Sequence, residues 1–66
     1  MSQATVYLGD EVVARDVTGL DPAEGGVCLT TLFEEPTFVP GQIRHIDFLR
    51  HRVLLDPLEE VDSERA

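Results

Sequence analysis

Three side chains of this sequence could bind a transition metal: one thiol and two imidazoles. Cys28 is the single cysteine, and His45 and His51 are the only histidines. Thiolate and imidazole groups suit zinc, nickel and copper. A lone thiol makes a poor site, however, and a spacing of six residues fits no standard ligand pair on one strand. The alternatives are a small buried hydrophobe for Cys28 and exposed turn residues for the histidines, unless a hairpin or a second copy gathers them.

A second group of candidate residues is basic. Arg44, Arg50 and Arg52 lie beside the two histidines and form the only basic cluster, which could contact an anion or an acidic partner, RNA phosphates included. The alternative is that the cluster offsets neighbouring acids, because thirteen acids face five arginines and no lysine, for a net charge of −8. Nucleic-acid binders need an excess of cations. Nucleic acid is therefore an unfavoured partner.

The sequence has no pattern typical of an enzyme. It contains no Gly-rich phosphate loop with lysine, no nucleophile elbow and no paired-cysteine motif. The adjacent acids at 10–11 and 34–35 are more typical of solvated turns than of a cation site. We therefore predict a protein that is not an enzyme.

The elements that would position these residues are short strands. Runs rich in β-branched and aromatic residues cover 5–8, 11–17, 27–33, 42–48 and 53–55, with turn residues between them. We expect breaks at 18–26, at 34–36 and at Pro40-Gly41. The mixed parity of 42–48 is compatible with a bulge near Arg44 or His45. Short strands at close turn spacing predict an all-β fold, a small sandwich or barrel of about five strands.

The chain of 66 residues is long enough for one small domain with a modest core. The predicted core is Val6, Leu8, Val12, Val17, Leu20, Val27, Leu29, Leu32, Phe33, Ile43, Ile46, Phe48, Val53 and Leu55. A core of this size usually needs support from disulfides, metal or oligomerisation. One cysteine excludes an internal disulfide, which leaves a metal, a partner or a homodimer.

We divide the chain into a domain at 1–56 and an acidic tail at 57–66. The tail holds four acids and one arginine, and we expect it to be mobile or a short helical turn rather than core. The first residues resemble no signal peptide, and no run approaches the length of a membrane span. With one free cysteine, the expected location is cytoplasmic, with no membrane contact.

Three stretches together resemble the CooT family of small nickel-accessory proteins. They are 4–8, 16–20 with the run from Leu29 to Glu35, and 41–55. Together they cover residues 2–56. The resemblance implies an SH3-like or Sm-like β-barrel that forms a homodimer and serves a metalloenzyme client, with nickel as the metal. The family also bears an older label of predicted RNA-binding protein.

At two positions the sequence differs from the family. In the nickel-binding member, the residue after the initiator methionine is a cysteine that binds the metal; here it is Ser2. The metal ligand is therefore unassigned, with Cys28, His45 and His51 as weak candidates. Where the family commonly turns on glycine, His51 stands, and a positive φ is uncommon for such a residue. Two further functions stay open: a metal-free dimeric interaction module and an RNA-binding module.

Overall fold

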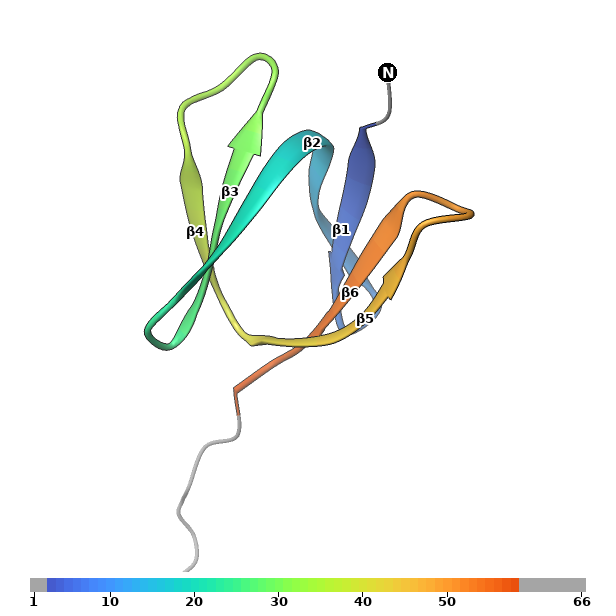
Figure 1. The fold of residues 1–66 in the computed structure, drawn as a ribbon. Coiled ribbons are helices and arrows are strands. Elements are labelled where there is room, and N and C mark those ends of the chain that lie inside the picture. The colour runs from blue at the N-terminus through green and yellow to red at the C-terminus, as the bar shows by residue number, and fades with distance from the viewer. Residues whose placement is uncertain (1–2, 59–66) are drawn as a thin grey trace, which may run out of the picture.

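A computed structural model describes residues 3–58, which form one six-stranded sheet (Figure 1). The strands are β1 Ala4–Leu8, β2 Glu11–Ala23, β3 Gly26–Thr31, β4 Thr37–Pro40, β5 Gln42–Asp47 and β6 Arg52–Asp56. Their order in the sheet is β4-β3-β2-β1-β6-β5. Neighbours pair antiparallel except β1 and β6, which pair parallel. The all-β prediction is confirmed. Residues 3–58 contain no helix long and apolar enough to span a membrane.

The first hairpin follows directly from its turn residues. Leu8 pairs with Glu11, so the connection is the two residues Gly9 and Asp10. Gly9 has φ 61°, and glycine at the first central position is the signature of a type II′ turn, whose twist matches that of the strands. β1 and β2 are thereby fixed as neighbours.

The break predicted at 18–26 is wrong as far as Ala23, because β2 continues to that residue and serves as two strands. Its first half, up to Val17, pairs with β1, and its second half, from Val17 to Ala23, pairs with β3. The register shifts near this point, and Asp16 has φ 57°, the geometry of a bulge. Beyond Val17 only β3 is a neighbour, so Pro22 lies on a free edge, where its missing N–H removes no ladder bond.

The sheet does not close into the predicted barrel. In the described part of the chain β4 and β5 are the two outer strands, and no ladder joins them. A single residue, Gly41, connects them, which is too few to reverse the chain into a hairpin. A side chain there would meet the Asp56 carbonyl oxygen at 3.0 Å and Leu8 Cδ1 at 3.1 Å. Figure 1 shows the chain running from β4 to β5 across the lower end of β6, where Gln42 pairs with Asp56.

One further difference and one confirmed prediction concern single strands. β4 was not predicted, because its four residues end at Pro40 and follow Pro36, and both prolines were interpreted as breaks between strands. The bulge predicted near Arg44 or His45 is confirmed: the register against β6 shifts between Ile43 and His45. This shift places Ile46 on the same face as Ile43.

Seven residues form the buried core. They are Val6, Val17, Val27, Leu29, Val39, Val53 and Leu55. Six of them were predicted, and Val39 was missed together with β4. Leu8 and Leu20 are partly buried against this core, as expected.

The other predicted core residues are wrong for the isolated chain. Leu32, Phe33, Ile46 and Phe48 are exposed, and Val12 and Ile43 each keep 37% of their surface exposed. The physical reason for Ile43 and Ile46 is the open sheet, since within residues 3–58 no strand pairs with the outer edge of β5. Leu32 and Phe33 follow the end of β3, and Phe48 lies in the turn after β5. Of the tail predicted at 57–66, Pro57 and Leu58 are exposed and irregular, and residues 59–66 lie outside the described residues.

The burial pattern predicts unequal costs for two leucines. Leu29→Ala removes a side chain with no exposed surface and should lower the free energy of unfolding by about 2–5 kcal/mol. Leu32→Ala, at a half-exposed position, is the matched control and should change it by less than about 1 kcal/mol. Urea unfolding at one protein concentration measures both; equal losses would contradict this core.

Candidate functional site

The three candidate metal ligands do not come together. Cys28 is half-buried in β3, with Asp21 of β2 and Phe38 of β4 as its register partners. His45 is exposed within β5, where it pairs with Leu54 of β6, and His51 is exposed in the turn before β6. Residues 3–58 hold no group of three His, Cys, Asp or Glu side chains able to bind a metal ion. Ser2 lies outside the described residues.

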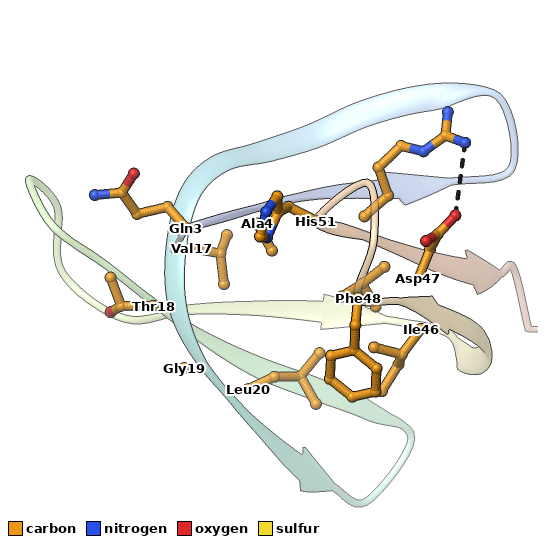
Figure 2. A pocket seen from close by; sticks show the side chains of 12 residues that line it. Gln3, Ala4, Val17, Thr18, Gly19, Leu20, Ile46, Asp47, Phe48 and His51 are labelled. Carbon is orange, nitrogen blue, oxygen red and sulfur yellow. Dashed lines mark ion pairs between the residues drawn. The ribbon is translucent and has the colours of Figure 1, made fainter. Parts of the chain in front are cut away.

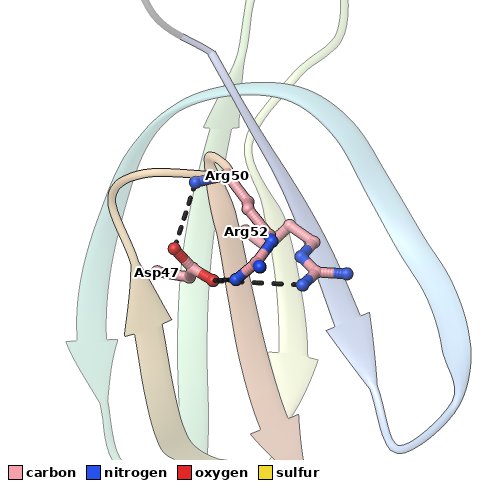
Figure 3. Close-up of polar contacts among 3 residues, drawn as sticks. All are labelled: Asp47, Arg50 and Arg52. Carbon is pink, nitrogen blue, oxygen red and sulfur yellow. Dashed lines mark hydrogen bonds and ion pairs between the residues drawn. The ribbon is translucent and has the colours of Figure 1, made fainter.

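Asp47 is the polar centre of the β5–β6 hairpin (Figure 3). The backbone N–H of Arg50 donates to Asp47 Oδ1 at 3.0 Å, and Arg50 Nη1 donates to Oδ2 at 3.2 Å. Arg52 Nη2 lies 3.9 Å from the same Oδ2. The Arg50 backbone hydrogen bond is the main cause that lowers the pKa of Asp47 below its usual 3.8; burial opposes it, and both guanidinium groups add to it.

The basic cluster is largely compensated within the chain. Arg50 and Arg52 share Asp47, and Arg44 Nη1 lies 3.8 Å from Asp56 Oδ1. Arg52 also has its guanidinium carbon 6.0 Å from the centre of the Tyr7 ring, within reach of a cation–π contact. This pairing favours the interpretation that these arginines offset local acids. Arg50 keeps 65% of its side chain exposed, so it can still meet a partner.

The turn that Asp47 clamps exposes two large apolar side chains. Phe48 is 82% exposed and Leu49 is 85% exposed. The turn ends at His51, whose φ of 57° is the left-handed conformation that favours glycine. The backbone carbonyl of His51 accepts a hydrogen bond from the Thr5 N–H at 2.9 Å, which ties the turn to the start of β1. The turn is therefore held at both ends.

An apolar hollow of about 250 Å³ lies between this turn and the second half of β2. Leu20, Ile46 and Phe48 line it, and Figure 2 shows the three side chains gathered on one side of it. Gln3, Asp47 and His51 lie on its polar rim. Sequence reasoning missed the hollow because it assigned Ile46 and Phe48 to a closed core. A signal was available: a tight turn cannot bury both Phe48 and the adjacent Leu49.

Comparison with known proteins points to one family. The model of the family described as "CO dehydrogenase accessory protein CooT" matches residues 1–56. A crystal structure provisionally described as CooT from Carboxydothermus hydrogenoformans superposes with a TM-score of 0.77 at 22% identity. The match covers 88% of this chain and all of that one. At that identity the likeness concerns the fold alone. No curated protein matches the chain.

The lowered pKa of Asp47 predicts a pH-dependent stability. Because the folded-state pKa lies below the unfolded value near 3.8, the ionised carboxylate stabilises the fold above that pH, and the contribution is lost as pH falls through the folded pKa. Asp47→Asn should therefore lower the urea midpoint at pH 7, with a difference that narrows below pH 3.8. Asp21→Asn, at an exposed acid of β2, is the control. If Asp47→Asn lowered the urea midpoint equally at pH 7 and below pH 3.8, the stabilising role of the ionised Asp47 carboxylate would be contradicted.

The positive φ of His51 predicts a stabilising substitution. His51→Gly removes the left-handed strain and should raise the free energy of unfolding by about 0.5–1 kcal/mol, after the entropic cost of glycine. His45→Gly, the matched change inside β5, should lower it by about 0.5–1 kcal/mol. Thermal unfolding of the parent and the two variants measures these changes. If both variants had a lower free energy of unfolding than the parent, the His51 side chain would stabilise the turn, and the prediction would be wrong.

Proposed function

This chain belongs to the CooT family, and from that premise we propose that it is an accessory protein in the maturation of a metalloenzyme, not a catalyst. The observation that supports this most is the family match over residues 1–56, which spans all six strands and ends where β6 ends. The client proposed is a nickel enzyme of the CO dehydrogenase type, because that is the enzyme named in the family's description. The expected setting is the cytoplasm.

We propose nickel as the cargo and two copies of the chain as its binding unit. The ligand set must extend beyond one copy of residues 3–58, because these hold no suitable group of metal-binding side chains. Ser2 supplies no thiolate, and a hydroxyl does not ionise near neutral pH. The remaining donors are the chain's N-terminus and side chains such as Cys28, His45 or His51, paired across two copies. Imidazole and thiolate both suit nickel.

The proposed homodimer is supported by how little of the chain is buried alone. Seven buried residues make a small core for a domain of this size. Large apolar side chains stay exposed at the β3–β4 loop, along β5 and in the β5–β6 turn. Ile46 and Phe48 line one hollow, and exposed apolar patches are typical of interaction sites.

A second candidate function is a metal-free dimeric interaction module of the same fold. The observation that favours it is the dispersal of Cys28, His45 and His51 over both halves of the sheet. In this alternative the chain binds its client through the exposed apolar surface and carries no metal.

Titration calorimetry with nickel on the tag-free protein, together with its mass in solution, separates these functions. We expect a dimer that binds one nickel ion per two chains, and Cys28→Ser and His45→Ala would then locate the ligands. A dimer that binds no nickel, zinc, copper or cobalt would contradict the metal function and favour the interaction module. Added histidine tags must be removed, since they bind nickel themselves.

A further inference from the structure

Two loops at the same end of the sheet expose aromatic side chains. One is the acidic loop, residues 32–36 between β3 and β4; the other is the basic turn, residues 48–51 between β5 and β6. Both lie toward the end of the sheet where β1 begins, because Ala4 and Thr31 both pair with Val17 of β2 and the Thr5 N–H bonds to the His51 carbonyl. Figure 1 shows the acidic loop at the upper left and the basic turn at the right. Phe33 of the acidic loop is 80% exposed, as exposed as Phe48 of the basic turn. Each loop thus presents a ring that its own chain does not cover.

The charges beside these two rings are opposite. Glu34 and Glu35 follow Phe33, whereas Arg50 and His51 follow Phe48. The difference extends beyond the loops: residues 9–35 contain seven acids and one arginine, while 42–56 contain three arginines and two acids. Complementary potentials steer association and select a partner. One chain therefore carries both halves of a complementary pair.

The hollow next to the basic turn can receive an aromatic ring. Its volume is about 250 Å³ and its walls include Leu20, Ile46 and Phe48. A cavity of roughly 150 Å³ already binds benzene in another protein. Arg50 follows Phe48 in the same turn and keeps 65% of its side chain exposed, so it is free to pair with a carboxylate of a docked partner.

We propose that a second copy of this chain docks by placing the partner's Phe33 in this hollow, with the partner's Glu34 and Glu35 against the basic turn. The proposal rests on the homodimer proposed above and gives it a geometry. The contact is reciprocal, because both patches lie at the same end of each chain, as a two-fold axis requires. Four phenylalanine rings, at roughly 150–250 Å² each, supply a large share of the ~1,200 Å² that stable interfaces bury.

The first test uses the fact that the chain has one cysteine. On a Cys28→Ser background, one protein carries Glu34→Cys and the other carries Leu49→Cys. The two proteins are mixed and oxidised, and the disulfide-linked dimers are identified by mass spectrometry. The proposal predicts that the mixed disulfide dimer exceeds both like-with-like dimers well beyond a statistical ratio of two to one. A statistical ratio, or linkage no faster than for a pair at Asp10→Cys and Glu24→Cys, would overturn it.

The second test separates the surface from the dimer itself. Phe33→Ser should weaken dimerisation at least tenfold in sedimentation, whereas Phe38→Ser, at a half-exposed ring of β4 outside both loops, should leave it within twofold. A parent chain that stays monomeric would contradict the proposed homodimer. A parent dimer that Phe33→Ser leaves intact would contradict only the surface assigned here. Circular dichroism of each variant establishes that the fold is retained.

Discussion

The parallel pairing of β1 with β6 is the contact that makes one sheet out of two pieces. It joins the group β4-β3-β2-β1 to the hairpin β6-β5. Val6 lies opposite Val53, and Leu8 lies opposite Leu55, so this seam contributes three of the seven buried residues. The Gly9 N–H bonds to the Leu55 carbonyl at 2.9 Å, and Thr5 bonds to His51 at the other end. The position of the basic turn, and hence of the hollow beside it, depends on this seam.

Local features of the structure could be predicted from the sequence, and non-local ones could not. The turn at Gly9, the bulge near Arg44 and five of the strands follow from residue types and parity, which act over a few positions. The closure of a sheet depends instead on contacts between distant segments. The bulge near Arg44 places Ile46 on the same face as Ile43, but only the arrangement of β4 and β5 decides whether another strand covers that face. Phe33 and Phe48 were assigned to the core because a closed barrel was expected to cover them.

The candidate site follows the same division. The thiol and the imidazoles could be identified from the sequence, yet their positions on separate halves of the sheet could not, because no spacing rule relates Cys28 in β3 to His45 in β5. The arginines were recognised as a cluster, and the structure adds the acids that pair with them: Asp47 for Arg50 and Arg52, and Asp56 for Arg44. Asp47 holds Arg50 through both backbone and side chain, so the turn between them presents Phe48 in a fixed setting rather than on a loose loop.

The seam between β1 and β6 also governs when the fold can form. Thr5 of β1 pairs with Arg52 of β6, so the first strand of the sheet completes its pairing only after the last strand has formed. Contacts this distant in sequence must overcome a large loop-closure entropy before they stabilise the fold, and this slows folding. Strands β1 to β3 precede β6 in the chain, and the edge of β1 that β6 covers stays unpaired until β6 docks. The nascent chain therefore passes through an interval of aggregation risk that ends only when β6 docks.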